Sequence, residues 1–186
     1  GWCGCCMGNG ARAIYYAWES ILSADERLLK VNLLLNRSSK WAEVKSHLPY
    51  EGRVQIEMKR TMGLEVRIPG WVDRNAIQVF NDGMAMDLTW SNEPGMQDHI
   101  KLGTVGMSHV VTIEFPMVEK YHEVDVPFPT DGNNPKHVRI QMRGNDVVDI
   151  WPKGLNAPFY QRAHYKQGWT LWKQVKTFSP DFEVDW

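Results

Sequence analysis

The feature that most constrains this chain is a change of hydrophobic period near residue 25. From Leu28 onward, apolar and polar residues alternate in short runs, as half-buried β-strands require. Turn sequences such as Pro69-Gly70, Asn81-Asp82-Gly83 and Gly144-Asn145-Asp146 separate the runs. The expected strands are 31–35, 54–58, 64–68, 77–80, 100–102, 110–115, 124–126, 138–142 and 147–150. Many short strands of this kind predict a mainly β fold, an antiparallel, jelly-roll-like β-sandwich.

Before residue 25 the pattern is helical. Asn9 is a candidate N-cap, and residues 11–22 repeat apolar side chains at steps of three and four. The apolar stripe consists of Ala11, Ile14, Tyr15, Trp18, Ile21 and Leu22. A single amphipathic helix needs a partner for its stripe, whereas a sandwich buries its own inner faces. We therefore expect this helix to belong to a helical domain that lies upstream of Gly1.

The change of period also predicts how the chain is divided. Residues 1–27 would be the end of a helical domain, residues 28–127 a β-sandwich, and residues 128–186 a C-terminal β-rich segment that packs on either. Proline and glycine cluster between Phe128 and Lys136, which favours a minor boundary there.

The composition excludes several classes of function. The 186 residues include 21 Lys and Arg against 22 Asp and Glu, so the net charge of −1 argues against binding to nucleic acid or to an anionic membrane. The 43% hydrophobic content predicts a globular chain, and no apolar run approaches the ~20 residues that span a bilayer. The compartment, cytoplasmic or periplasmic, and a homodimer both stay open.

The three cysteines, Cys3, Cys5 and Cys6, all fall within the first six residues. With no cysteine downstream, the chain has no disulfide framework. The start of the helix presents unpaired N–H groups that favour a thiolate, and a thiolate can act as a nucleophile or as a zinc ligand. The six histidines show no ligand-like spacing, so a complete zinc site within this chain is not expected. Buried structural cysteines are the equally weighted alternative.

Several motifs resemble one enzyme family. The segment Cys5-Cys6-Met7-Gly8-Asn9 is similar to the Cys-Cys-x-x-Asn motif of the β-L-arabinofuranosidase-like enzymes of glycoside hydrolase family 127. Arg67-Ile68-Pro69-Gly70-Trp71 matches the family's Arg-Ile-Pro-Gly-Trp signature, and the segments 31–36 and 157–162 also look like family segments. The resemblance implies an (α/α)-barrel followed by β-sandwich domains, with this chain as the C-terminal part.

The resemblance also implies a site and a mechanism. Cys5 takes the position of the nucleophile and Cys6 that of a zinc ligand; Cys5 would also bind the metal. Cys3 is an additional thiol that could replace a ligand or take over the role of the nucleophile. The other ligands, a Glu and a Cys, and the acid/base Glu would lie upstream. Asn9 and Arg12 are candidates for binding the carbohydrate substrate. The implied reaction is retaining hydrolysis through a thioglycosyl intermediate, and the chain alone would be inactive.

Other residues have a second interpretation beside packing. Five tryptophans, Trp71, Trp90, Trp151, Trp169 and Trp172, could stack on sugar rings, but we expect most to fill the core. Arg67 and Arg162 could clamp a ligand, although Arg67 alternates with apolar residues and is expected on a solvent face. The rival function is a non-catalytic carbohydrate-binding or interdomain sandwich module with structural cysteines.

Overall fold

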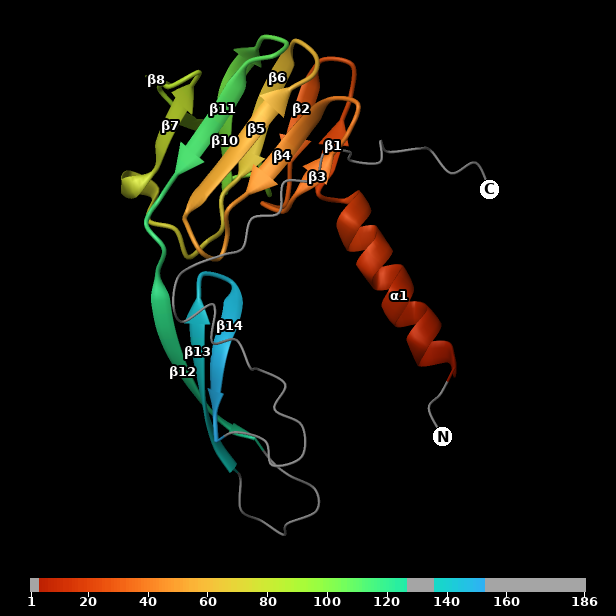
Figure 1. The fold of residues 1–186 in the computed structure, drawn as a ribbon, viewed down its shortest axis with the longest axis vertical. Coiled ribbons are helices and arrows are strands. Elements are labelled where there is room, and N and C mark those ends of the chain that lie inside the picture. Colours follow the sequence, from red (N-terminus) through yellow and green to blue (C-terminus); the bar gives the residue numbers. More distant parts are fainter. Residues whose placement is uncertain (1–3, 127–135, 153–186) are drawn as a thin grey trace.

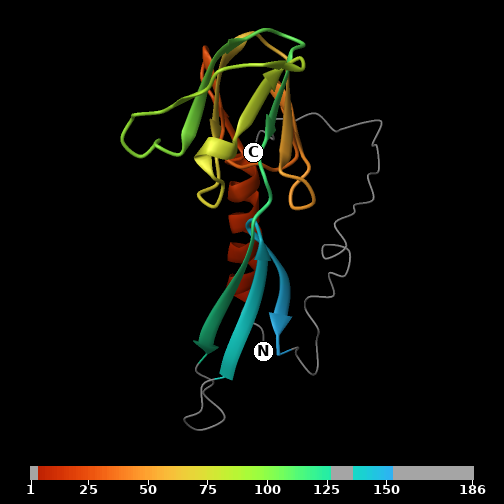
Figure 2. The same cartoon turned by 90° about the vertical axis from the view of Figure 1, so that its left-hand side faces the viewer.

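The computed structural model describes residues 4–126 and 136–152, with the side chains of residues 8–126 and 137–152. One α-helix, α1 (Gly4–Glu19), is followed within these ranges by strands that form three sheets. Two of the sheets form a β-sandwich, and α1 and the third sheet project from the same end of it (Figures 1 and 2). The predicted fold class, a mainly β sandwich preceded by one helix, is confirmed.

The first sheet of the sandwich has five strands and is mixed. Their order is β1 (Leu22–Ala24), β2 (Leu28–Val31), β6 (Met62–Arg67), β10 (His99–Val105) and β9 (Thr89–Trp90). All its pairs are antiparallel except β2 and β6, which run parallel with Val31 opposite Val66. The parallel pair is possible because a long connection, residues 32–61, crosses to the other sheet before returning.

The second sheet has six antiparallel strands. Their order is β3 (Arg37–Ser38), β4 (Ala42–Ser46), β5 (Arg53–Met58), β11 (Val110–Glu114), β7 (Gln78–Asn81) and β8 (Met84–Ala85). The tight turn between β7 and β8 has positive φ at Asp82 and Gly83, as the predicted Asn-Asp-Gly turn requires. A short 3₁₀-helix (Arg74–Ala76) precedes β7.

The alternating side chains of both sheets meet in one core. The fully buried members include Leu29, Val31, Val44, Val54, Ile56, Met58, Leu64, Val66, Ile100, Val105, Val111 and Ile113. They come from the central strands of both sheets, which is what period-two patterning predicts when one face of each sheet is buried. The described part of the chain contains no helix long and apolar enough to cross a membrane.

A third, antiparallel sheet extends away from the sandwich. It consists of β12 (Glu119–Val126), β13 (Lys136–Arg143) and β14 (Asp146–Trp151). The turn between β13 and β14 approaches the sandwich so closely that a Cβ on Gly144 would lie 2.7 Å from the Trp71 ring. Arg143 Nη2 donates to the carbonyl of Tyr50 at 3.0 Å. These contacts attach the tip of the third sheet to the sandwich.

The helix differs from its prediction at both ends. It begins at Gly4 instead of residue 11, so Asn9 lies inside it and is not the N-cap. No proline interrupts residues 4–10, and the glycines at 8 and 10 cost only about 1 kcal/mol each in helix propensity. It ends at Glu19 because Ile21 and Leu22 are drawn into the sandwich core, where both are buried. These two residues therefore do not belong to the helical stripe.

One further prediction of a strand is wrong in its bounds. The strand expected at 31–35 is observed earlier, as β2 (Leu28–Val31). At Asn32 the chain leaves the sheet, and its side-chain amide donates to the Ser20 carbonyl and the Ser23 hydroxyl at 3.1 and 3.0 Å. The side chain thus closes the end of the β1–β2 pair. The other expected strands are confirmed, but the short strands β1, β3, β4, β8 and β9 were not predicted.

Candidate functional site

The thiol pair belongs to the first turn of α1. Cys5 and Cys6 directly follow Gly4, the first residue of the helix, whereas Cys3 lies outside the described residues. Their side chains also lie outside the described part, so the prediction of a reactive thiol stays a prediction. The backbone position still fits it, because the first four N–H groups of a helix have no intrahelical partner and favour negative charge. The neighbouring residues Gly8, Asn9 and Arg12 are exposed.

Helical spacing brings the candidate substrate residues into line with Cys5. Positions 5, 9 and 12 follow one another at steps of four and three, so they occupy one stripe of α1. This alignment was not visible while the helix was expected to start at residue 11.

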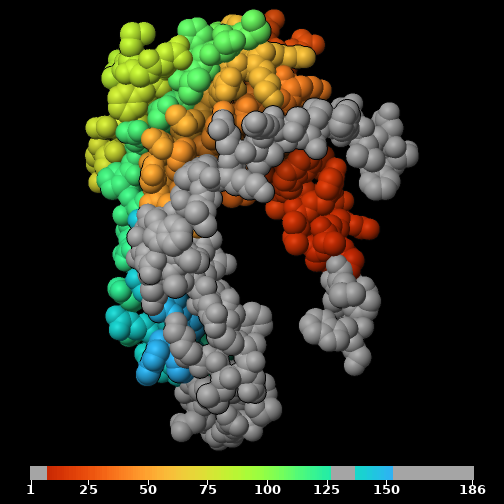
Figure 3. All heavy atoms as spheres, viewed as in Figure 1, coloured from red at the N-terminus to blue at the C-terminus, as the bar shows by residue number. Residues whose placement is uncertain are grey.

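The thiol end of α1 lies far from the sandwich. Glu19 lies fourteen positions after Cys5, which corresponds to roughly 20 Å along the axis at ~1.5 Å per residue. Figure 3 shows α1 standing out from the sandwich as a separate column. A pocket around the thiols therefore cannot be formed by the sandwich.

The surface of α1 is apolar to an unusual degree for an exposed helix. Ile14 is 74% exposed, and Tyr15, Tyr16 and Trp18 are also exposed. These residues cover more than one side of the helix, a pattern typical of helices buried within a larger helical structure. The predicted need for a helical partner is consistent with this exposure.

The C-terminal end of α1 is held by one arginine that sequence reasoning missed. Arg37 Nη1 donates to the carbonyl of Glu19 at 2.7 Å and also to that of Trp18, and its guanidinium lies 4.0 Å from the centre of the Trp18 ring. A cation at this end complements the helix dipole. Arg37 thus fixes the direction in which α1 leaves the sandwich.

No metal centre can be assembled from the side chains that the structure describes. Within residues 8–126 and 137–152, no three His, Cys, Asp or Glu side chains cluster closely enough to hold an ion. The remaining candidates for metal binding are Cys5 and Cys6, with Cys3 in addition. Two or three neighbouring thiols supply only part of a tetrahedral zinc shell.

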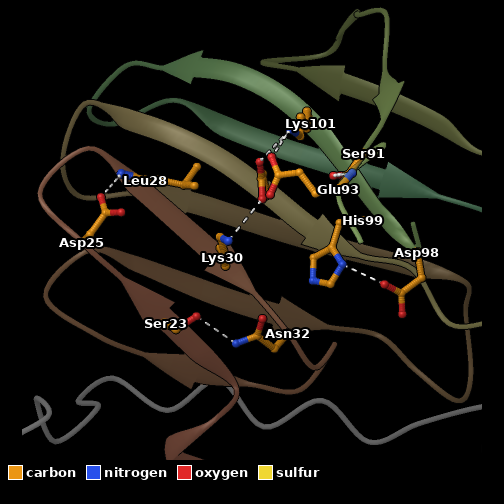
Figure 4. Close-up of polar contacts among 11 residues, drawn as sticks. Ser23, Asp25, Leu28, Lys30, Asn32, Ser91, Glu93, Asp98, His99 and Lys101 are labelled. Carbon is orange, nitrogen blue, oxygen red and sulfur yellow. Dashed lines mark hydrogen bonds and ion pairs between the residues drawn. The ribbon is translucent and has the colours of Figure 1, made fainter. Parts of the chain in front are cut away.

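The outer face of the five-stranded sheet carries a row of ion pairs (Figure 4). Glu65 is buried between Lys30 and Lys101, each 3.8 Å away, and Lys101 also pairs with Glu93 at 2.7 Å. The hydrogen bond from Lys101 is the main cause that lowers the pKa of Glu93. These pairs join strands β2, β6, β10 and the segment after β9.

A second polar group on this face resembles a catalytic dyad, but no nucleophile among the described residues contacts its histidine. His99 Nδ1 lies 2.8 Å from Asp98 Oδ1, while Asp98 Oδ2 accepts from Arg67 Nε at 2.5 Å. Burial opposes ionisation of Asp98, but the hydrogen bonds from Arg67 and His99 outweigh it and lower its pKa. Nearby Ser91 instead accepts from the Glu93 N–H, and His99 Nε2 has no partner among the described residues. The group therefore stabilises the sheet.

The Arg-Ile-Pro-Gly-Trp motif is not brought together with the thiol pair. It lies at the junction between sandwich and third sheet, whereas the thiol pair lies at the far end of α1 (Figure 1). Arg67 is exposed, as its alternation with apolar residues predicted, and its guanidinium pairs with Asp98. Trp71 packs edge-to-face on Phe115 with ring centres 5.6 Å apart, so its packing interpretation is confirmed. A cavity of about 440 Å³ is lined by Arg67 and Trp71.

The remaining tryptophan and arginine candidates separate into three groups. Trp90 is half-buried beneath the Arg74 guanidinium at 4.1 Å, which favours packing. Trp151, at the end of β14, is 64% exposed and does not fill the core. Trp169, Trp172 and Arg162 lie outside the described residues.

The fold of this chain is similar to part of known enzymes. No family model and no curated protein sequence matches the chain. A solved structure described as a glycoside hydrolase matches with a TM-score of 0.55 at 16% identity, covering 78% of this chain and 25% of its own. A GH127 β-L-arabinofuranosidase from Geobacillus stearothermophilus T6 matches with a TM-score of 0.49 at 21% identity, covering 78% and 24%. A GH127 β-arabinofuranosidase gives 0.46 at 18% identity, covering 68% and 23%.

The chain has the fold of one quarter of a glycoside hydrolase. This conclusion rests on the match with a TM-score of 0.55, which includes most of this chain. The chain spans only about a quarter of the length of that enzyme. The match confirms that the fold resembles part of a glycoside hydrolase, as the sequence motifs predicted.

Proposed function

We propose that this chain is the C-terminal portion of a retaining glycoside hydrolase of the family 127 type. The observation that carries the proposal is the Cys5–Cys6 pair in the first turn of a helix that leads directly into a sandwich with a hydrolase fold. The exposed apolar surface of α1 supports it, because a barrel domain upstream would cover that surface.

In the proposed reaction, the Cys5 thiolate attacks the anomeric carbon of the sugar. A bond forms between sulfur and this carbon while the bond to the leaving-group oxygen breaks, and that oxygen takes a proton from a carboxylic acid of the upstream domain. A water molecule, deprotonated by the same carboxylate, then displaces the sulfur, and two inversions leave the configuration retained. Asn9 and Arg12 would hydrogen-bond sugar hydroxyls from the same helical stripe.

The donor set fits part of a zinc site. Cys5 and Cys6 would hold the ion, or Cys3 would replace one of them. The upstream domain would supply the remaining ligands. When bound, zinc keeps a coordinated thiol deprotonated near neutral pH. The substrates expected from the resemblance are β-L-arabinofuranosides or related glycans. Since the acid/base residue and other ligands would lie upstream, the 186-residue chain alone should be inactive.

The test is covalent labelling of Cys5. The polypeptide carrying the upstream domain is treated with an arabinofuranosyl haloacetamide, and the modified peptide is identified by mass spectrometry. We expect the label on Cys5 together with loss of aryl β-L-arabinofuranosidase activity, and a Cys5→Ala variant with at least about a 10³-fold lower kcat, as for other nucleophiles.

Variants of the neighbouring thiols give the controls. Cys3→Ser should keep activity if Cys3 is neither nucleophile nor ligand, whereas Cys6→Ser should lose zinc as measured by elemental analysis. Full activity of Cys5→Ala would overturn the proposal and favour the non-catalytic module. Turnover by the isolated 186-residue chain would overturn the assignment of the acid/base residue to an upstream domain.

A further inference from the structure

One face of the third sheet has a composition that packing does not explain. The antiparallel register places Glu123 opposite Arg139, and Arg139 opposite Trp151, in one row across the three strands. The next row consists of Tyr121, Gln141 and Asp149. Because side chains alternate between faces, these six residues share one face. It carries two aromatic rings among polar side chains and no aliphatic residue.

The two aromatic rings are exposed. Tyr121 is 55% and Trp151 is 64% exposed, although burying either ring would be favourable. A hollow of about 530 Å³ lies between them, lined by Tyr121, Trp151 and the polar side chains. This volume lies within the ordinary range for small-molecule sites.

The polar groups of the hollow suit a ligand rich in hydroxyl groups. The guanidinium of Arg139 and the amide of Gln141 are planar groups with two or more donors, while Glu123 and Asp149 are acceptors. Planar side chains of this kind can bond two neighbouring hydroxyls at once. An aromatic ring beside them can cover the apolar C–H face of a sugar.

Charge narrows the class of ligand further. Arg139 Cζ lies 4.3 Å from the centre of the Tyr121 ring, so the position that a ligand cation would take on this ring is already filled. Anionic ligands are disfavoured by the carboxylates of Glu123, Asp125 and Asp149. His137, 2.9 Å from Asp125 and 3.7 Å from Glu123, offsets only part of this charge.

We propose that this face, defined by Tyr121, Glu123, Arg139, Gln141, Asp149 and Trp151, binds a neutral oligosaccharide outside any catalytic pocket. The proposal rests on the proposed function only in the choice of a carbohydrate as the ligand. The evidence for the binding face is independent of that function. The thiols, zinc and an upstream domain are not needed. A neutral glycan held here would raise the local concentration of substrate for an attached hydrolase.

The experiment measures binding to the 186-residue chain. Neutral arabino-oligosaccharides are titrated and followed by calorimetry and by saturation-transfer NMR, with an oligogalacturonate and spermine as anionic and cationic probes. We expect millimolar binding of the neutral probe only. Trp151→Ala should weaken it about tenfold or more, as expected for loss of a stacking ring, whereas Trp151→Phe should stay within about threefold.

A matched control comes from α1. Tyr16 has the same 55% exposure as Tyr121, and Tyr16→Ala should leave binding unchanged, whereas Tyr121→Ala should weaken it. Circular dichroism verifies that each variant is folded, and Gln141→Ala provides a milder change if an aromatic variant unfolds. Absent binding of neutral probes, preference for a charged probe, or equal affinity of Trp151→Ala and the wild type would each overturn the inference.

The thiol proposal can fail separately. Alkylation of the three cysteines with iodoacetamide should leave oligosaccharide binding intact. If alkylation abolished binding, the binding site would lie at the thiol end of α1 and this inference would be wrong. If Cys5 proved inert in the longer polypeptide while the Trp151 effect held, only the hydrolase mechanism would fall.

Discussion

The sandwich and the helix α1 solve the problem of burying apolar residues in opposite ways. In the sandwich, two sheets face each other and seal side chains such as Ile56 completely, whereas Ile14 on α1 is 74% exposed. Both residues obey the periodicity of their own element. The local hydrophobic pattern therefore specifies a helix or a strand, but only packing against a partner of matching shape makes that helix or strand stable.

This difference bears on function. Because the sandwich buries its own core, it can hold helix α1 in place without supplying catalytic residues itself. The helix, which carries the thiol pair at its far end, leaves its apolar surface exposed. The proposed active site thus lies on α1, the helix whose apolar side chains are not covered by the described residues.

Equal substitutions in the two regions should produce the largest contrast. Ile56→Ala opens a cavity in the sealed core and should lower the free energy of unfolding by about 2–5 kcal/mol. Ile14→Ala removes an exposed side chain and should change it by no more than about 0.5 kcal/mol. Urea titrations followed by tryptophan fluorescence measure both. Comparable losses would show that α1 is already buried in this chain.

A second contrast concerns backbone contact within the sandwich. A Cβ on Gly52 would lie only 1.8 Å from the carbonyl oxygen of Phe115, whereas one on Gly70 would meet nothing within 4 Å. We expect Gly52→Ala to cost about 1–3 kcal/mol, as other overpacked sites do, and Gly70→Ala to cost little. The midpoints of thermal unfolding of the two variants measure this difference. An unshifted midpoint for Gly52→Ala would contradict the close approach.

The junction of the two regions is tested at Arg37. Arg37→Ala removes the contacts to the Glu19 carbonyl and to the Trp18 ring, and should cost about 1 kcal/mol. The loss should fall on α1, with lower helical ellipticity at 222 nm and an unchanged sandwich. Arg60→Ala, at an exposed site of the sandwich, is the control. Equal ellipticity in both variants would show that Arg37 does not hold the helix.

The smallest effect is a pH dependence in the β7–β8 turn. The Asp82 carboxylate accepts from the Val110 N–H at 2.8 Å, and this bond, aided by His109, lowers the pKa of Asp82 below its ordinary 3.8. The stabilisation is present above that ordinary value and is lost as the pH falls through the folded-state pKa. Asp82→Asn, which also tolerates the positive φ, should flatten the decline in stability below pH 4. Parallel curves for wild type and variant would contradict this.

The sandwich was largely predictable from the sequence because each central strand alternates buried and exposed residues. Strands such as 54–58 and 64–68 carry that pattern in full. The parallel pairing of β2 with β6 was not predictable, since it depends on how a long connection returns. The short strand β4 was missed because two of its three buried residues, Ala42 and Ser46, are small or polar and give a weak signal.

The candidate site was predictable in its residues but not in its arrangement. The motif around Cys5 and Cys6 was identified from the amino-acid sequence. The structure adds that positions 5, 9 and 12 lie on one stripe of the helix. The role of Arg37 was hidden because its partners are backbone carbonyls, which have no sequence signature. The face around Arg139 was hidden because it depends on the register of three strands.

Amide hydrogen exchange of the 186-residue chain tests the central claim most directly. A 16-residue helix with two internal glycines and no tertiary cover is marginal in water, so amides of α1 should open at less than about 1 kcal/mol. Amides of β5 and β11 should exchange only at the free energy of global unfolding. Protection of α1 equal to that of the sandwich would contradict the claim that the thiol-bearing helix awaits another domain.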